Sequence, residues 1–375
     1  MSGIIIGADF VPTQSNYDLF INGDSQQLVG ENLLNLFQQA DYRVFNLEVP
    51  LTNDKNPILK QGPNLIAPEA CVMGYKALGV DLLTLANNHI LDQGVEGLFR
   101  TIELLTDSGI SWVGAGKNVS EAAAPFFFEL HGKRIGVYAC AEHEFSIATS
   151  SVPGANPFDP LEATDHISHI KKDCDFLIVL YHGGKELYPY PSPQLQKRCR
   201  KLVEKGADIV ICQHSHCIGS KEEYLKGTII YGQGNFLFDN SNNELWKTGL
   251  LIKIDEDFSI AYIPIVKKGN VVRLAEKEEK EKILYAFFQR SEAIRQENFV
   301  EEEYNRLADK VFDNYLLCFS GKESFLFRAV NRLTNGRLRK WMMGRRYGIS
   351  QRIRIQNYIA CEAHNELFLR GLKND

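Results

Sequence analysis

Three of the nine histidines follow directly on two short apolar runs. His182 comes after the run Phe176–Tyr181, and His214 and His216 come after the run Asp208–Cys212. Such runs are typical of buried strands, and an extended chain sends residues two apart to the same side. Because imidazole binds ions such as zinc, iron and manganese, His-Ser-His is expected to direct both rings to one metal centre. One histidine alone after a strand is more often a loop residue, so the prediction depends on all three.

Carboxylates follow two other apolar runs. Asp9 follows Gly3–Gly7, and Glu48 follows Tyr42–Leu47, where Pro50 stops the strand. In open α/β sheets, ligands bind at the edge formed by the carboxyl ends of the strands. Asp9 and Glu48 are therefore candidate metal ligands, although a single acid at such a position often serves only a turn or a helix cap.

The run Val80–Leu85 leads into a third polar cluster, which contains Asn88, His89 and Asp92. The carbonyl oxygen of an asparagine is a neutral metal ligand, and an adjacent histidine is available for proton transfer. The alternative interpretation is an Asn-rich turn that caps a helix over Val95–Asp107. The other strand ends favour the functional interpretation.

The elements that would position these side chains alternate along the chain. Strands that deliver polar residues are separated by segments with helical periodicity, which is typical of an α/β fold. The predicted helices cover residues 30–39, 68–78, 95–107, 161–172 and 194–205. Further strands are predicted over residues 110–114, 124–130, 134–140, 227–231 and 249–254.

Length and composition restrict the class of protein. The 375 residues are long for one domain, so we predict a core domain over 1–270 and a helical extension over 271–375 without strands. A net charge of -5 argues against a nucleic-acid partner. The eight cysteines are scattered and contain no C-x-x-C pair, which excludes a zinc knuckle as the interpretation. With no signal peptide and no membrane-length apolar run, a cytoplasmic location is expected.

The segment 332–354 is the one strongly basic part of the chain. It holds eight Arg and Lys residues and no acid, interleaved with Trp341, Met342, Met343 and Tyr347. One interpretation is a helical face that packs on the acidic core. The other is a surface for an anionic polymer, a partner or a phospholipid membrane, which would make the protein peripheral to the inner face of the membrane. A homo-oligomer is a further option.

The strand-end residues stand in an order that resembles the calcineurin-like metallophosphoesterase superfamily. The surrounding motifs are similar, more closely, to the CapA family of bacterial capsule and poly-γ-glutamate synthesis proteins, over residues 3–254. The motifs that carry the resemblance are A-D-F-V-P-T, N-L-E-V-P-L-T, L-A-N-N-H-I-L-D-Q-G, Y-H-G-G-K-E, G-A-D-I-V-I-C-Q-H-S-H and Y-G-Q-G-N-F-L-F-D.

The resemblance implies a four-layer α/β/β/α sandwich with a centre for one or two divalent ions, of which Mn, Fe or Zn are expected. Glu48 would bridge the two ions. Asp9 and His216 would hold one ion, and Asn88, His182 and His214 would hold the other. His89 would donate a proton or stabilise an oxyanion, with Asp92 orienting its ring.

Two departures from the superfamily pattern bear on activity. Val11 stands where the superfamily usually has histidine, and Glu48 stands where it usually has aspartate, so one ion would have fewer protein ligands. We therefore expect a metal-dependent hydrolase or acyl (amide-forming) transferase that acts on a capsule or exopolymer precursor at a phosphoester or amide bond. The alternative is a non-catalytic assembly subunit of a capsule or poly-γ-glutamate synthase.

Overall fold

Strand β1 (Ile4–Asp9) is apolar on both faces, and these two faces define the layers of the core. Ile4 and Ile6 join the same apolar cluster as Ile178 of β9 (Phe176–His182), whereas Ile5 joins a separate cluster on the opposite face. The computed structural model describes residues 3–239, 241, 243–321 and 325–372. A sheet that is covered on both faces needs a continuous apolar run such as Ile-Ile-Ile, and the sequence provides it.

The first sheet consists of β1, β2 (Tyr42–Asn46), β3 (Leu82–Thr84), β4 (Ser111–Val113), β13 (Thr248–Ile254), β14 (Ile260–Lys268) and β15 (Val271–Leu274). Its order is β15-β14-β13-β1-β2-β3-β4. Strands β1 to β4 run parallel, and the other three continue the sheet antiparallel from β1. The carboxyl ends of β1, β2 and β3 therefore lie at one edge.

The second sheet consists of β6 (Phe126–Leu130), β7 (Lys133–Ala141), β9, β10 (Ile209–Gln213), β11 (Lys221–Tyr224) and β12 (Gly227–Ile230). Its order is β11-β12-β10-β9-β7-β6, with β7, β9, β10 and β12 parallel. The short strands β5 (Ala115–Gly116) and β8 (Gly154–Ala155) form a separate pair.

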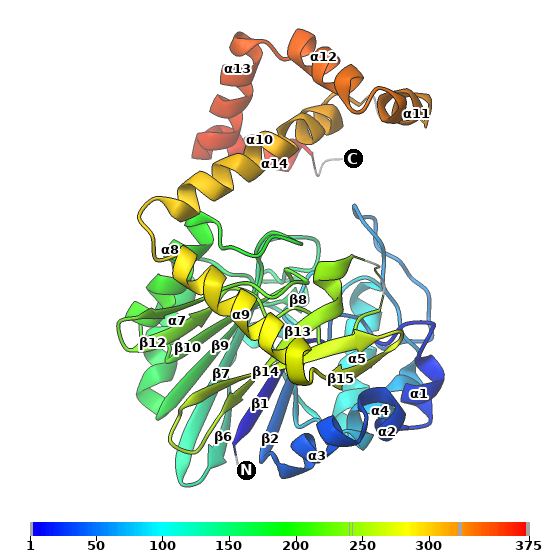
Figure 1. The fold of residues 1–375 in the computed structure, drawn as a ribbon, viewed down its shortest axis with the longest axis vertical. Coiled ribbons are helices and arrows are strands. Elements are labelled where there is room, and N and C mark those ends of the chain that lie inside the picture. The colour runs from blue at the N-terminus through cyan, green and yellow to red at the C-terminus, as the bar shows by residue number, and fades with distance from the viewer. Residues whose placement is uncertain (1–2, 240, 242, 322–324, 373–375) are drawn as a thin grey trace. The chain divides into compact units, whose positions relative to one another are not determined.

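Helices cover the outer faces of both sheets (Figure 1). Those on the first sheet are α1 (Tyr17–Ile21), α2 (Ser25–Val29), α3 (Glu31–Gln39), η1 (Glu69–Cys71), α4 (Val72–Ala77) and α5 (Gly94–Asp107). Those on the second are α7 (Glu162–Ile170) and α8 (Pro193–Glu204), and the shorter elements are α6 (Val119–Ala122), η2 (Lys171–Asp173) and η3 (Glu244–Lys247). The expected four-layer α/β/β/α sandwich is confirmed.

Local sequence signals predicted the bounds of these elements closely. The predicted helices, and the strands that carry candidate ligands, agree with the structure to within two residues at each end. Helix α8 shows why, since Ser192 caps its first turn by accepting a hydrogen bond from Leu195 N (3.0 Å) and Pro193 occupies its first position. Gly206, with φ of 121°, then turns the chain toward β10.

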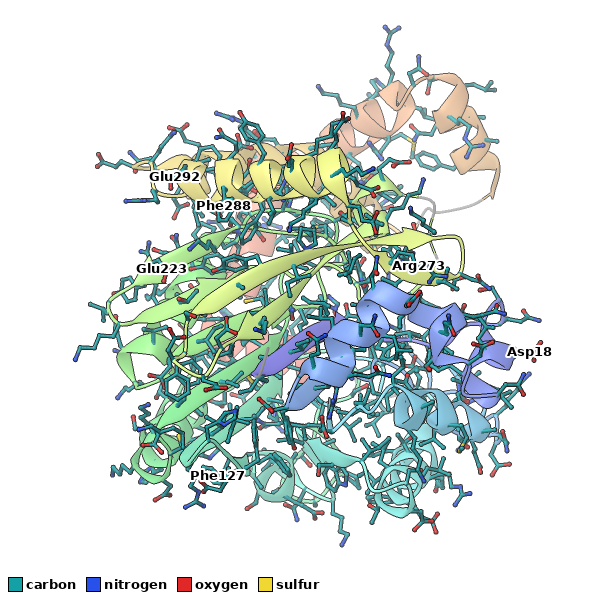
Figure 2. All side chains as sticks on the ribbon, turned by 60° about the horizontal axis from the view of Figure 1, so that its bottom comes forward. Asp18, Phe127, Glu223, Arg273, Phe288 and Glu292 are labelled. Atoms are coloured by element: carbon teal, nitrogen blue, oxygen red, sulfur yellow. The ribbon has the colours of Figure 1, made fainter. Side chains whose placement is uncertain are left out.

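The prediction of no strand beyond residue 270 is wrong, because β15 adds an edge to the first sheet. Arg273 of β15 donates to the carbonyl oxygens of Leu28 (3.2 Å) and Gln27 (3.0 Å), which ties this edge to α2 (Figure 2). Four residues beside a charged stretch give too short a pattern to identify from periodicity. Helix α9 (Lys277–Ala293) follows, and its Phe287 is fully buried in the cluster between the sheets.

The chain forms two compact units, Met1–Val300 and Glu301–Asp375. The domain boundary at 270/271 stays a prediction, because a division into compact units does not show which parts of the chain fold independently. The second unit is helical, with α10 (Phe299–Phe319), α11 (Phe325–Leu333), α12 (Arg337–Arg346), α13 (Ile349–Ala360) and α14 (Glu362–Gly371). Among the described helices, none is both long and apolar enough to cross a bilayer.

Candidate metal centre

The carboxyl ends of strands from both sheets bring the predicted ligands together. Asp9 and His182 are the last residues of β1 and β9, and Glu48 lies two residues beyond β2. His214 follows β10 directly, and Asn88 lies in the turn after β3. Residues that are far apart in the sequence thus meet because parallel strands end at the same edge.

The geometry of His-Ser-His differs from the expectation. His214 and His216 have left-handed backbones, with φ of 82° and 52°, so the segment is a tight turn rather than an extended strand. The two rings, whose centroids are 5.9 Å apart, turn toward different neighbours. His214 approaches Glu48, and His216 approaches Asp9. The expected extended backbone is therefore wrong, but both rings still reach one centre, because Glu48 belongs to both groups. The motif supplies one imidazole to each of the two groups. Positive φ at two non-glycine residues is strain that the surrounding packing must hold.

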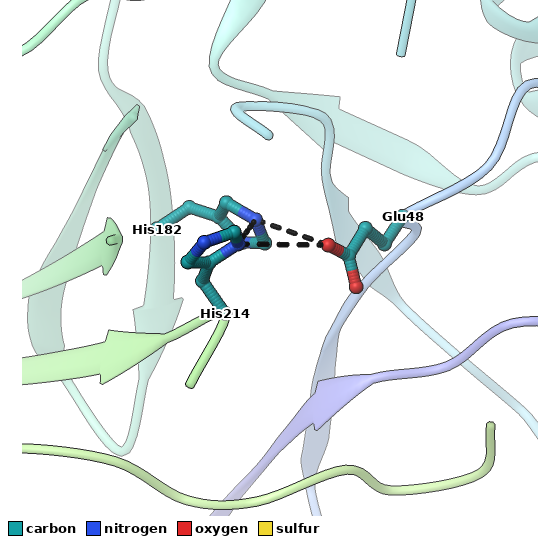
Figure 3. Close-up of side chains that lie close together, drawn as sticks. All are labelled: Glu48, His182 and His214. Carbon is teal, nitrogen blue, oxygen red and sulfur yellow. Dashed lines mark hydrogen bonds and ion pairs between the residues drawn. The ribbon is translucent and has the colours of Figure 1, made fainter. Parts of the chain in front are cut away.

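The first group consists of Glu48, His182 and His214, whose nitrogen and oxygen atoms converge (Figure 3). His182 Nε2 lies 3.2 Å from Glu48 Oε1, and His214 Nδ1 lies 3.9 Å from the same oxygen. The two nitrogens are 3.1 Å apart. Asn88 Oδ1 approaches His182 Nε2 to 3.0 Å, which completes the predicted ligand set.

The second group consists of Asp9, Glu48 and His216. His216 Nδ1 lies 3.3 Å from Asp9 Oδ2 and 2.8 Å from the side-chain amide of Asn235. The ring of Trp246 packs on that of His216 with centroids 4.0 Å apart. Val11, at the position of the missing superfamily histidine, lies instead in the apolar cluster under the first sheet. Each group offers three ionisable ligands within 4.8 Å of one another, and Glu48 belongs to both.

Asn46 connects the two groups, and no sequence pattern marked it as a site residue. This residue is fully buried, and its Nδ2 lies 2.7 Å from Asp9 Oδ1 and 3.2 Å from His182 Nδ1. Its Oδ1 accepts hydrogen bonds from Thr84 Oγ1 and Asn87 Nδ2, both at 3.1 Å. Because both ends of the amide are engaged, Asn46 fixes one ligand of each group relative to the other.

The burial of Glu48 makes the centre a candidate cation site. Its side chain is completely buried, and among the described residues neither carboxylate oxygen has a hydrogen bond of good geometry. An ionised carboxylate removed from water needs a compensating charge. Burial acts to raise the pKa of Glu48, but the surrounding imidazoles, His182 foremost, more than offset it and hold the pKa well below the usual range. The orphaned oxygens and the imidazole nitrogens fit a divalent ion such as Mn, Fe or Zn.

The buried carboxylates also shift the pKa values of His214 and His216. Burial acts to lower the pKa of His216, but the carboxylates of Asp9 and Glu48 raise it to about 9. Burial likewise opposes the charge on His214, and the nearby Glu48 carboxylate raises its pKa above the usual value. The site therefore attracts positive charge, which protons supply in the metal-free chain.

His89 and Asp92 form an adjacent cluster with a residue that sequence reasoning missed. His89 Nδ1 lies 2.5 Å from Asp92 Oδ2, which also accepts a hydrogen bond from Leu65 N at 2.6 Å. Lys60 binds Asp92 Oδ1, and its Nζ lies 3.2 Å from His89 Nδ1. The Lys60 side chain is only 2% exposed. Lys60 lies in an irregular loop, and no local sequence pattern links residue 60 to residue 92.

The loop Glu142–Glu144 also reaches the centre. Asn88 Nδ2 donates to Glu144 Oε2 at 2.8 Å, so Glu144 orients the amide whose oxygen faces His182. The structure thus gathers all eight predicted residues in two neighbouring clusters. Their roles as ligands and catalytic groups stay predictions.

Comparison with known families agrees with this arrangement. The family model of the bacterial capsule synthesis protein PGA_cap matches residues 7–240, more than half of the chain. The chain belongs to this family. The PGA_cap match contains every predicted site residue from Asp9 to His216, and the helical unit lies outside it.

Curated relatives carry related names. The capsule biosynthesis protein CapA of Bacillus anthracis is 33% identical over 211 residues, covering 54% of this chain and 51% of that protein. The PGA biosynthesis protein CapA of Bacillus subtilis is 30% identical over 210 residues, covering 54% of this chain and 55% of that protein. The chain thus spans about half the length of the curated relatives that it matches.

Solved structures give a weaker likeness. A putative 5'-nucleotidase from Staphylococcus aureus is 14% identical with a TM-score of 0.44, covering 76% of this chain and 58% of that chain. A phosphatase from Mycoplasma pneumoniae is 16% identical with a TM-score of 0.42, covering 71% and 94%. The fold assignment follows from the sheet topology and not from these scores.

Proposed function

We propose that the chain is a metal-dependent enzyme of bacterial capsule or exopolymer biosynthesis. It would hydrolyse or transfer at a phosphoester or an amide bond of a polymer precursor. The observation that carries the proposal is the completely buried Glu48, whose oxygens face two groups of metal-ligating side chains and lack satisfactory hydrogen bonds among the described residues. Membership of the capsule synthesis family supports the biological setting.

In this proposal the two ligand sets would hold two ions. Asn88, His182 and His214 would hold one ion and Asp9 with His216 the other, with Glu48 shared between them. Divalent ions at such a centre lower the pKa of bound water and offset the negative charge that develops on an oxygen during hydrolysis or transfer.

His89 is the group suited to proton transfer. Its side chain is 12% exposed, and Asp92, which holds its Nδ1, is completely buried. With Nδ1 engaged, Nε2 is the nitrogen free to exchange a proton with a leaving group or an attacking group. Lys60 fixes Asp92 from the other side and so keeps the ring of His89 in one orientation.

Metal analysis of protein purified without chelator, together with a screen of phosphoester and amide substrates, tests the proposal. We expect at least one bound divalent ion per chain and turnover of one substrate class, both lost in Glu48→Gln. His89→Ala should retain the ion and lose turnover. Protein that contains no divalent ion and takes up none when it is offered would refute the proposal.

A non-catalytic assembly role is the second candidate. A Mycobacterium tuberculosis relative, 29% identical over 229 residues and covering 56% of this chain and 59% of that protein, is named a probable polyglutamine synthesis accessory protein. Complementation of a capsule defect distinguishes the two roles. A chain carrying His89→Ala with His214→Ala should fail if the centre is catalytic and succeed if the protein only supports assembly.

A further inference from the structure

One side of helix α12 is basic and exposed. Arg337, Lys340, Trp341 and Arg345 recur at positions i, i+3, i+4 and i+8, which lie on the same side of a helix. All four side chains are exposed, and Trp341 is 58% exposed. We call these four residues the α12 basic face. Met343 points away from it and is fully buried in the small core of the helical unit, so packing within the unit holds the face outward.

The cations of this face are not neutralised within the described part of the chain. No described acidic side chain forms an ion pair with Arg337, Lys340 or Arg345. The guanidinium of Arg345 lies 5.2 Å from the centroid of the Trp341 ring, so the aromatic and the cationic groups stand together. Lys201 of α8, an exposed cation of the core unit, by contrast pairs with Glu204 at 2.8 Å. The α12 basic face therefore presents uncompensated positive charge.

Large apolar side chains are exposed on α13, the next helix along the chain. Ile349 is 80% exposed and Ile353, one turn later, is 59% exposed. Apolar side chains next to aromatic and cationic ones are the composition of a helix that lies in the interface of a bilayer. Cations would contact phosphate groups, Trp341 would lie at the level of the headgroups, and the isoleucines would reach the acyl boundary.

We propose that the α12 basic face binds the surface of a membrane that contains anionic phospholipid. Charge complementarity selects an anionic partner, and the exposed apolar residues of the next helix, α13, favour a lipid surface over a hydrophilic polyanion, which offers them no apolar contact. The proposal is independent of the metal centre, because no residue of either cluster takes part in it.

Co-sedimentation of the full chain with vesicles tests the proposal. We expect binding to vesicles of phosphatidylcholine with phosphatidylglycerol and none to pure phosphatidylcholine, with binding weakened by salt. Each cation near such a surface contributes about a factor of five, so Arg337→Gln, Lys340→Gln and Arg345→Gln together should lower the partition coefficient roughly 100-fold. Trp341→Ala alone should weaken binding without changing its salt dependence.

A matched control removes the same charge elsewhere. Lys277, Lys280 and Lys282 are exposed on α9, and their change to glutamine together should leave vesicle binding intact. Equal loss in the control and the α12 variant would overturn the proposal, since only net charge would then matter. Equal binding to neutral and anionic vesicles would overturn it as well. So would retention on poly-γ-glutamate without any vesicle binding, which would identify the face as a polymer site.

Discussion

Glu48 and Asp92 are both completely buried carboxylates, yet their surroundings differ. Asp92 is bound by Lys60, His89 and the backbone N–H of Leu65, so the chain itself supplies the charge and the hydrogen bonds that it needs. Glu48 faces imidazole nitrogens, and within the described residues its oxygens lack acceptable hydrogen bonds.

On our proposal, the difference separates a structural charge, Asp92, from a metal ligand, Glu48. A buried carboxylate is tolerated when it is paired, and an unpaired one costs several kcal/mol. Asp92 is paired within the fold, so it orients His89 whether or not an ion is bound. Glu48 faces imidazoles, which are themselves metal-ligating groups, so we expect this site to gain from an external cation.

The largest expected effect concerns the cluster of Lys60, His89 and Asp92, in which the chain itself balances the charge of the buried carboxylate. Asp92→Asn leaves the ammonium group of Lys60 buried without its partner and should lower the free energy of unfolding by about 3–5 kcal/mol, measured by urea denaturation. Adding Lys60→Met should restore part of that loss, because the two effects are coupled. Metal content should stay at the wild-type level. Unchanged stability, or loss of the bound ion, would indicate that Asp92 serves the ion as Glu48 does and is not a structural charge.

Glu48→Gln should give the opposite result. It keeps the shape of the side chain but removes the charge shared by both ligand groups, so ion affinity should fall by more than roughly 100-fold, the upper range for residues that merely orient ligands. Isothermal titration calorimetry, in which Mn or Zn is added to protein freed of metal by a chelator, measures this affinity. If Asp92→Asn lowers the affinity for the ion as much as Glu48→Gln does, the two carboxylates are equivalent and the comparison fails.

Removal of the ion should destabilise only chains with an intact Glu48. At a free ion concentration 100 times the Kd, binding adds about 2.7 kcal/mol to the folded state. A chelator should therefore lower the Tm of the wild type and of Asp92→Asn, and leave that of Glu48→Gln unchanged. A chelator-induced shift in Glu48→Gln would show that the stabilising ion binds elsewhere.

Asn46→Leu should have the smallest of these effects while reaching both ligand groups. Loss of its amide releases Asp9 and His182 together, and orienting residues of this kind contribute about 10–100-fold to affinity. Asn235→Leu, which touches only the Asp9–His216 group, should weaken one binding step alone. Two-step titrations in which the variants behave alike would contradict the linking role of Asn46.

The sequence predicted the parts of this comparison that depend on local pattern. Asp9, Glu48 and His182 could be placed at one edge because each follows an apolar run, and runs of this kind form parallel strands. The left-handed turn at His214 and His216 could not be predicted, since non-glycine residues rarely adopt positive φ.

Partners far apart in the sequence were also beyond prediction. Lys60 meets Asp92 through an irregular loop, and Asn46 looked like an ordinary residue near the end of a strand. Strand β15 was missed because tertiary pairing with β14, rather than a long periodic run, makes Val271–Leu274 extended. Local patterns therefore identified which residues meet at the site, and long-range contacts determine how their charges are balanced.

Anomalous diffraction from crystals grown with Mn or Zn tests the central claim most directly. We predict a peak at bonding distance, about 2.0–2.3 Å, from Glu48 and from the facing nitrogens of His182 and His214. Beside Asp92 we predict no peak. A map with no peak at Glu48, or with ions only at exposed histidines, would contradict the account.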